Sequence, residues 1–586
     1  MSFLSRIMVL KSQAHFSAGV YNRFGGPSPA GLAIEGSRKK KSGQAKSRVG
    51  LLILGFMGVY AVIGGRLVEY AMKDQEVVSS ILPPDRLMAS RPDILDRNGE
   101  VLATDIRTVS LFAEPNKIVD ADEAVEKLAT VLPELDVRDT YKKLSVKTSH
   151  FAWLRRQLTP KQQSQILALG IPGIGFRPEK RRFYPGGATA AHILGYVNID
   201  NRGVAGMEKF IDDQGLADLA SVGMTSDQPL EPVRLSIDLR VQNIVRDAVV
   251  NAVNNFQAKG AGAAVIDVHT GEVLAMASAP DFDPNDPQEG AKEGWLNRMT
   301  NGTFEMGSTF KTFSLAMALD SGKVKMTDSF DASKSIYIGG FTIHDFHGQR
   351  RWLTVPEIFQ YSSNIGTARV IDIVGIDAQK DYLTKLGLLT KMQTELPEVK
   401  MPSQPRVWKK INSITISFGH GVSTTALQTG VAAAALVNGG KLIEPTFLPR
   451  TREQADQIAK QVLKKSTSDE VRYLLDFNGY KGSGRVARVP GFAVGSKTGT
   501  ADKVVNGRYS ATLNFNSFIA AFPINDPRYA VITFCDEPKT GEKAYGGTLS
   551  AGTAGPIARD IISRAGPILG IEPKFGEGGS ALLVSY

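Results

Sequence analysis

A run of uncharged, mostly apolar residues near the N-terminus stands out in the hydrophobic pattern. It covers residues 49–65 and contains no charged side chain. A helix needs about 17–25 such residues to cross a bilayer, and Leu67 and Val68 extend the run if the side chain of Arg66 snorkels. The pattern therefore predicts a transmembrane anchor at 49–70. A cleaved signal peptide is the alternative, but no clear small-x-small cleavage site follows the run.

The second half of the chain alternates between strand-like and helical patterns. Helical periodicity covers residues 239–256, and a mostly apolar helix is expected from Ser308 to Asp320. Strand-like apolar runs occur at 262–277, where a His-Thr-Gly turn divides the run in two, and at 516–522 and 529–535. Strands at both ends with helices between them predict an α+β domain at 233–568, an antiparallel sheet capped by helices. The Gly-rich end, residues 569–586, is expected to be a flexible tail.

The region between the anchor and this domain mixes short elements of both kinds. Asn98-Gly99 is a strong reverse-turn signal between two strands, and residues 178–187 are expected to form a loop. Asp96 and Arg97 are expected to form a structural ion pair. With 586 residues the chain is long enough for two or three domains, and 73–230 is interpreted as a separate, elongated, non-catalytic domain.

Charge is concentrated at one end of the chain. The net charge is +10, but residues 1–48 hold nine basic side chains and one acid, so the rest of the chain carries only about +2. This argues against a nucleic-acid-binding face. The positive-inside rule places residues 1–48 in the cytoplasm, as a disordered tail, and everything after the anchor on the exported side. We therefore expect a single-pass membrane protein with its large domains on the exported side.

The content of cysteine and histidine limits the possible chemistry. Cys535 is the only cysteine, so an intrachain disulfide or a CxxC metal site is impossible. The seven histidines show no HExxH spacing, and no metal or cofactor is expected. His344, His347 and His420 are interpreted as structural or rim residues. Glu305 is interpreted as a packing or capping residue.

Three short motifs follow one another in the predicted C-terminal domain. They are Ser308-Thr-Phe-Lys311, Ser362-Ser-Asn364 and Lys497-Thr498-Gly499-Thr500. The first pattern alone is weak, because Ser37-Arg-Lys-Lys40 also matches it. The ordered trio at these separations is a strong signal for serine-based acyl transfer.

Each of the first two motifs has a chemical reason. A serine hydroxyl needs a partner to take its proton before it can act as a nucleophile. Ser308 and Lys311, at i and i+3 of a helix, can meet on one face. Burial and a cationic neighbour such as Lys497 would lower the pKa of Lys311 and let it act as the base. Ser362 can relay a proton to the leaving amine, and Asn364 can orient Lys311 or hold the substrate amide.

The third motif is expected to be an edge strand that binds substrate. Gly499 leaves room for a substrate backbone to approach and pair along the edge. Thr498 and Thr500 offer hydroxyls, and Lys497 offers a positive charge, to a terminal carboxylate. The backbone N–H groups of Ser308 and Thr500 are candidates for the oxyanion hole.

Beyond the trio, the chain from residue 49 onward resembles the class B penicillin-binding proteins, specifically the cell-division transpeptidases of the penicillin-binding protein 3 type. The segment from Arg91 to Ala103 is similar to that family's Arg-Gly-x-Ile-x-Asp-Arg-Asn-Gly motif, with Pro92 where glycine is usual. Further matching segments are Arg182–Pro185 with Ala191–Tyr196, Gly203–Glu208, and Ser417–Gly421 followed by Ala426–Gln428. Met306 stands where the family usually has proline.

The resemblance implies both fold and reaction. It implies a pedestal domain of the dimerisation type at 73–230 and a transpeptidase domain similar to serine β-lactamases. Ser308 would attack the D-Ala-D-Ala bond of a peptidoglycan stem peptide, and an amine of a neighbouring stem would then attack the acyl-enzyme. β-Lactams would acylate the same serine. The implied location is the bacterial inner membrane, with the catalytic domain in the periplasm. The implied partners are a polymerising glycosyltransferase and other membrane proteins of division.

Other functions remain as alternatives. A β-lactamase shares the trio but needs a residue for rapid deacylation, for which Glu395 and Glu398 stay open from the sequence. A β-lactam-sensing receptor would need a large cytoplasmic effector domain. A division scaffold and an elongation-type transpeptidase are further alternatives.

Overall fold

The structure is a computed structural model that describes residues 54–66, 91–215, 230–286, 296–505, 507–539 and 548–575. Residues 54–66, within the predicted anchor, are helical. Among the described residues, no helix is both long enough and apolar enough to span a membrane. The predicted cytoplasmic tail and residues 576–586 lie outside the described residues.

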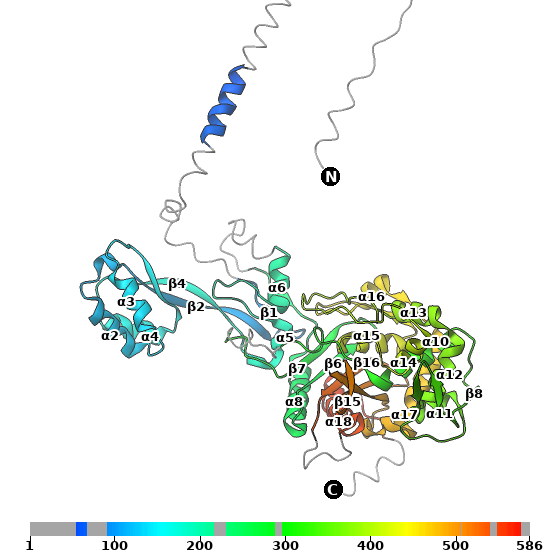
Figure 1. Cartoon of the computed structure of the whole chain (residues 1–586). Helices are drawn as coiled ribbons and strands as arrows, with labels where there is room; N and C mark the ends of the chain where they lie inside the picture. The colour runs from blue at the N-terminus through cyan, green and yellow to red at the C-terminus, as the bar shows by residue number, and fades with distance from the viewer. Residues whose placement is uncertain are drawn as a thin grey trace, which may run out of the picture. The chain divides into compact units, whose positions relative to one another are not determined.

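The first large region is built on a five-stranded sheet in which β2 is the central strand (Figure 1). β2 pairs antiparallel with β1, β3 and β4, and β1 pairs in parallel with β5. Helices α2 and α3 lie beside the end of the β2–β4 ribbon that contains Leu111. Leu111, Leu128 and Leu158 form part of a small hydrophobic core there. The elements are β1 (Ile94–Leu95), β2 (Val101–Ala113), η1 (Pro115–Lys117), α2 (Ala121–Val131), α3 (Val137–Ser145), β3 (Ala152–Leu158), α4 (Pro160–Ala168), β4 (Ile174–Phe183), η2 (Gly187–Ala190), α5 (Ala191–Leu194), α6 (Gly206–Asp213) and β5 (Val233–Arg234).

A buried network of charges ties these elements together. Arg182 donates to Glu208 Oε1 at 2.6 Å and contacts Asp105 at 3.2 Å. Arg91 contacts the other oxygen of Glu208 at 2.8 Å, and Asp212 at 2.6 Å. The side chains of Arg91, Arg182 and Glu208 are at most 3% exposed, so each charge depends on its partners for stabilisation.

The second large region contains a five-stranded antiparallel sheet in the order β14-β15-β16-β6-β7. The predicted helix at 239–256 is α8 with those bounds, and the predicted strands around the His-Thr-Gly turn are β6 and β7. β14 is at the edge of the sheet, as expected from the third motif. The remaining elements are α8 (Leu239–Phe256), β6 (Gly260–Asp267), β7 (Val273–Ala279), η3 (Gly307–Thr309), α10 (Phe310–Asp320), β8 (Ser329–Asp331), β9 (Ile336–Ile338), β10 (Phe341–Ile343), β11 (Trp352–Thr354), α11 (Val355–Gln360), α12 (Asn364–Val374), α13 (Ile376–Lys385), α14 (Lys410–Ser417), α15 (Ala426–Val437), β12 (Lys441–Leu442), α16 (Arg452–Ile458), β13 (Lys460–Gln461), α17 (Lys465–Lys481), η4 (Ser483–Ala487), β14 (Gly495–Val505), β15 (Arg508–Phe522), β16 (Tyr529–Asp536), η5 (Ser550–Gly552) and α18 (Ala554–Ile568).

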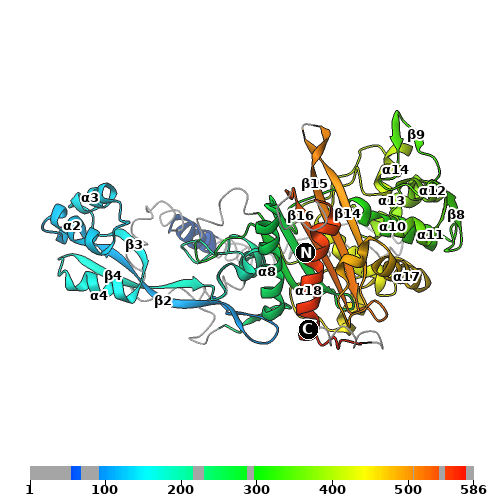
Figure 2. The ribbon, with the colours of Figure 1, turned by 90° about the horizontal axis from the view of Figure 1, so that it is seen from below.

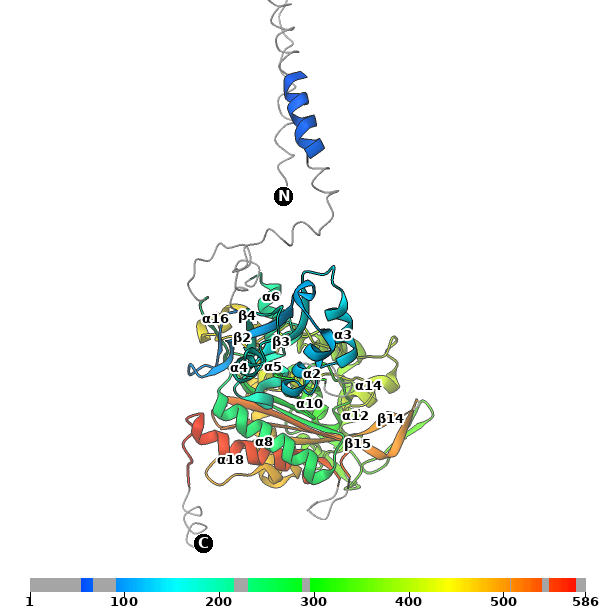
Figure 3. The same ribbon diagram turned by 90° about the vertical axis from the view of Figure 1, so that its left-hand side faces the viewer.

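The sheet separates two hydrophobic cores because its strands alternate their side chains between two buried faces. Ile519 and Ile532 face the larger core, which includes α10, α12 and α15. Phe518 and Val531 face the smaller core, where α8 and α18 pack. Figures 2 and 3 show α8 and α18 side by side on one side of the sheet, and Figure 2 shows α10, α12 and α17 on the other. The side chains of Lys311, on α10, and of Lys497, which lies over the Phe359 ring, are on the side of the larger core.

Two expectations from the sequence are wrong. Residues 178–183 were expected in a loop but form the second half of β4, paired with β2 along its length. Asp96 and Arg97 do not pair with each other. Asp96 accepts hydrogen bonds from the backbone N–H groups of Asn98, Glu100 and Leu239, while Arg97 contacts Glu272 at 3.5 Å.

Candidate active site

Ser308 lies in the 3-10 turn η3, directly before helix α10, which carries Lys311. The sequence placed Ser308 inside the helix, but the two side chains meet as expected, because Lys311 Nζ donates to Ser308 Oγ at 2.9 Å. Gly307 has a φ of +55°, a conformation that glycine adopts without strain. This turn presents the Ser308 hydroxyl to the lysine at the start of α10.

Ser362 connects the first motif to the third. It lies between α11 and α12 and has a φ of +55°, which is unusual for a residue other than glycine. Its Oγ accepts from Lys311 Nζ at 3.0 Å and from Lys497 Nζ at 3.1 Å, and its carbonyl accepts from Lys311 at 2.6 Å. One serine hydroxyl is therefore shared by two lysines that come from a helix and a strand.

Both lysines are buried. Lys311 is 1% exposed and Lys497 is fully buried, with its ammonium 5.7 Å from the centre of the Phe359 ring. Burial lowers the pKa of Lys311 well below its usual value, and the nearby charge of Lys497 lowers it further, while Asp345 opposes the shift. Burial also lowers the pKa of Lys497 to about 7. A neutral amine that can accept the Ser308 proton is therefore accessible at neutral pH.

Glycines bring the turn of Ser308 against strand β14. A Cβ on Gly307 would lie 2.4 Å from the carbonyl oxygen of Thr500, and one on Gly499 would lie 2.3 Å from that of Met306. A Cβ on Gly419 would lie 2.0 Å from the carbonyl oxygen of Gly307. The sequence assigned the space at Gly499 to an approaching substrate, but the protein's own backbone fills it. The same packing places the backbone of Ser308 beside that of Thr500.

The other predicted site residues have partners within the protein. Thr498 Oγ1 is 2.7 Å from Ser483 Oγ. Thr500 Oγ1 donates to Asn516 at 2.9 Å and accepts from the backbone N–H of Ser550 at 3.2 Å, so this hydroxyl is engaged inside the protein. The side chain of Asn364 donates to the carbonyl of His344 at 3.0 Å, and the hydrogen-bond partners of Lys311 Nζ are Ser308 and Ser362. Among the described contacts, Asn364 does not orient Lys311 directly.

Asp345 is a residue near the site that the sequence did not reveal. Its carboxylate accepts from Ser363 Oγ at 2.7 Å and from the backbone N–H of Ile365 at 2.9 Å. These bonds fix the turn that holds Ser362. No motif surrounds Asp345, and the side chains it meets are about 20 residues away in sequence, so the sequence offered no signal for it.

Glu305 and His420 form a second layer at the rim of the site. Glu305 accepts from the backbone N–H of Gly421 at 2.7 Å and from Tyr509 Oη at 3.3 Å, and burial raises its pKa. The rings of His420 and Tyr509 are 5.6 Å apart. Burial, followed by the charge of Lys311, lowers the pKa of His420 to about 4, so its imidazole is neutral at neutral pH.

Glu395 and Glu398, which the sequence left as candidate bases for deacylation, form hydrogen bonds to other parts of the protein. Glu395 accepts from Thr446 Oγ1 at 2.5 Å and from the backbone N–H of Phe447 at 2.9 Å. Glu398 accepts from the backbone N–H of Gly206 at the start of α6, at 3.2 Å. Both carboxylates therefore hold structural elements together. Within the described ranges, no cluster of three or more His, Cys, Asp or Glu side chains could hold a metal ion.

Comparison with known families places these features in one class. Residues 261–563 match the penicillin binding protein transpeptidase domain, and residues 86–216 match the penicillin-binding protein dimerisation domain. The chain is 37% identical to the probable peptidoglycan D,D-transpeptidase FtsI of Caulobacter vibrioides, over 83% of this chain and 82% of that protein. It is 32% identical to the probable peptidoglycan D,D-transpeptidase PenA of Neisseria gonorrhoeae, over 91% and 95% of the two chains. It is 30% identical to the peptidoglycan D,D-transpeptidase FtsI of Escherichia coli K12, over 81% and 84%. The chain therefore belongs to the class B penicillin-binding proteins, of the penicillin-binding protein 3 type.

Proposed function

We propose that this protein is a serine D,D-transpeptidase that cross-links peptidoglycan stem peptides during septal cell-wall synthesis. The observation that carries the proposal is the hydrogen-bonded chain from Ser308 through Lys311 and Ser362 to Lys497. The names of the relatives support the substrate, and the two relatives named FtsI support the role in division. An uncharged run at 49–65 supports a membrane anchor with the catalytic domain in the periplasm.

In the proposed reaction, neutral Lys311 accepts the proton of Ser308 as Oγ attacks the carbonyl carbon of the D-Ala-D-Ala bond. The negative charge on the carbonyl oxygen is stabilised by the backbone N–H groups of Ser308 and Thr500. Ser362 passes a proton to the leaving nitrogen, D-Ala departs, and an acyl-serine ester remains. An amine from a neighbouring stem then attacks the ester, and the released Ser308 oxygen regains its proton.

Substrate binding is assigned to the third motif. Lys497 and Thr498 would bind the terminal carboxylate, and Asn364 would contact the substrate amide from the opposite side. Thr500 would act through its backbone N–H, since its hydroxyl already has two partners. A substrate peptide would lie along the edge of β14. The remaining partners are β-lactams, a polymerising glycosyltransferase and other division proteins at the membrane.

The experiment is covalent labelling with a fluorescent penicillin. The full-length protein in membranes should give a label that survives denaturation, because the adduct is an ester. Ser308→Ala should abolish the label, while Ser321→Ala, at the other end of α10, should retain it. A label that disappears within seconds would indicate a β-lactamase, and an unlabelled but folded wild-type protein would leave only the scaffold alternative.

A further inference from the structure

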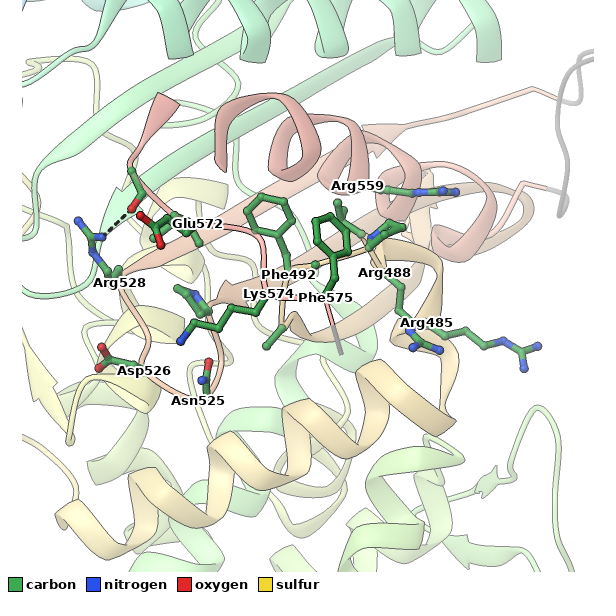
Figure 4. Close-up of a pocket in the computed structure, with 17 residues that line it drawn as sticks. Arg485, Arg488, Phe492, Asn525, Asp526, Arg528, Arg559, Glu572, Lys574 and Phe575 are labelled. Carbon is green, nitrogen blue, oxygen red and sulfur yellow. Dashed lines mark hydrogen bonds between the residues drawn. The ribbon is translucent and has the colours of Figure 1, made fainter. Parts of the chain in front are cut away.

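A large cleft lies on the transpeptidase domain away from the three motifs (Figure 4). Its volume is about 1090 Å³, and it is open to solvent on one side. The walls come from η4 and the loop after it, from the turn between β15 and β16, from α18, which carries Arg559, and from the chain after α18. None of the motif residues lines the cleft, so the proposed transpeptidation does not account for it. We refer to it as the basic cleft.

Basic side chains outnumber acidic ones in the lining of the basic cleft. Five are basic and two are acidic: Arg485, Arg488, Arg528, Arg559 and Lys574, against Asp526 and Glu572. Arg528 is held by the carbonyl of Gly570 and by Tyr529, and Arg488 lies 5.0 Å from the centre of the Tyr480 ring. In the part of the chain that the structure describes, the side chains of Arg485, Arg559 and Lys574 have no ion-pair or hydrogen-bond partner. The cleft therefore presents uncompensated positive charge.

The basic cleft also has an apolar surface. Phe492 and Phe575 both line it, and Figure 4 shows their rings between Lys574 on one side and Arg485, Arg488 and Arg559 on the other. The Phe575 side chain is 48% exposed although it is large and apolar. The chain at Lys574 is fixed in place, because its backbone N–H donates to the carbonyl of Gly491 at 2.7 Å. An exposed aromatic surface rimmed by charge is typical of an interaction site.

These observations select the chemistry of the ligand. Arginine is suited to bidentate recognition of carboxylates and phosphates. The cations come from four separate segments around a volume near the upper limit for small-molecule pockets, so an extended ligand fits better than a single anion. Asp526 and Glu572 would repel a polyphosphate or an anionic membrane surface, whereas a peptide brings backbone N–H groups that can donate to them.

We propose that the basic cleft binds an acidic segment of a partner protein that also carries an apolar side chain as an anchor. Carboxylates of the segment pair with Arg485, Arg559 and Lys574. The apolar side chain packs on Phe575 and Phe492. This surface would be a protein contact on the transpeptidase domain itself, separate from the membrane anchor and the pedestal.

The test uses the full-length protein and a fluorescein-labelled peptide of repeated Glu-Glu-Phe triplets, with binding measured by fluorescence anisotropy. The wild type should bind, and its affinity should fall as salt rises. The double variant R485E/R559E should bind at least tenfold more weakly. A Glu-Glu-Ala peptide should bind the wild type several-fold more weakly, because it lacks the aromatic anchor.

The matched control is K161E/K391E, which reverses two exposed lysines outside the cleft and leaves the net charge equal to that of the double variant. It should bind the peptide like the wild type. Penicillin labelling and thermal unfolding check that each variant is folded, and R485Q/R559Q replaces the reversal if that variant fails this check. Equal binding by wild type and the cleft variant, or an equal loss in the control, overturns the proposal. Tighter binding of inorganic polyphosphate or phosphatidylglycerol vesicles, lost in the cleft variant, also overturns it.

Discussion

The contact between Gly419 and Gly307 makes one substitution especially informative. In Gly419→Ala the new methyl group would lie 2.0 Å from the Gly307 carbonyl oxygen and 2.5 Å from its carbonyl carbon. Cβ atoms stay about 3.0 Å or more from other heavy atoms. The Gly307–Ser308 peptide must therefore move by about 1 Å or more. That peptide carries the Ser308 N–H assigned to the oxyanion hole.

Two costs of this substitution can be separated. Alanine at the positive φ of Gly419 costs roughly 1–2 kcal/mol in stability, because a side chain disfavours the left-handed region. The movement of the nucleophile has a different cost, since a misplacement of about 1 Å lowers a reaction rate on the order of 100-fold. Gly421→Ala provides the matched control. Its φ of +93° is nearly that of Gly419, at +91°, but its Cβ would meet nothing closer than 3.6 Å.

The assay is the second-order rate of acylation by a fluorescent penicillin, measured beside thermal unfolding. Both variants should unfold at a somewhat lower temperature than the wild type. Only Gly419→Ala should lose about two orders of magnitude in acylation rate. If the two variants acylate at similar rates, the packing of Gly419 does not position the nucleophile, and the reasoning is refuted.

Three further outcomes follow from the buried charges. Lys311→Met should lower the acylation rate on the order of 100- to 10,000-fold, and the wild-type rate should fall in acid, because Lys311, whose pKa is held well below its usual value, gains a proton there and can no longer accept that of Ser308; a rate that stays flat in acid contradicts this. Arg182→Met should destabilise the protein by roughly 3–5 kcal/mol in urea unfolding, because it leaves buried carboxylates uncompensated, whereas Arg155→Met at an exposed ion pair should cost at most about 1 kcal/mol. His420 has a folded-state pKa of about 4, below its usual 6.5, so the free energy of unfolding should decrease as the pH falls from 6.5 to 4. His420→Phe should make this decrease smaller. The same pH dependence of unfolding in the variant and the wild type would contradict the prediction.

Local patterns in the sequence predicted the elements that contain the site. The helix at 239–256 follows from its periodicity, the strands at 262–277 follow from apolar runs around a His-Thr-Gly turn, and the i, i+3 spacing of Ser308 and Lys311 placed their side chains together. Each of these features depends on residues that are close in the chain. The edge position of the third motif also followed from its composition.

Features that depend on distant partners were not predictable. Residues 178–183 are rich in charge and include a proline, so no alternating apolar pattern marks this strand, although Arg182 is buried against Glu208 and Asp105. Asp96 and Arg97 have opposite charges and adjacent positions, but neighbouring side chains in the chain need not face each other. The positive φ of Ser362 depends on contacts of the folded protein, including those of Asp345 beside it.

Strand β14 pairs on one side only, with β15, in the order of its sheet. Proteins usually prevent free edges from joining other chains by adding proline, outward charges or a covering element. Residues 495–501 contain no proline, and their one charged side chain, Lys497, is turned into the protein. Such an unpaired edge is therefore a template for aggregation when partly unfolded chains meet. A ligand bound along this edge, as proposed for the stem peptide, would occupy that template and so protect the folded state.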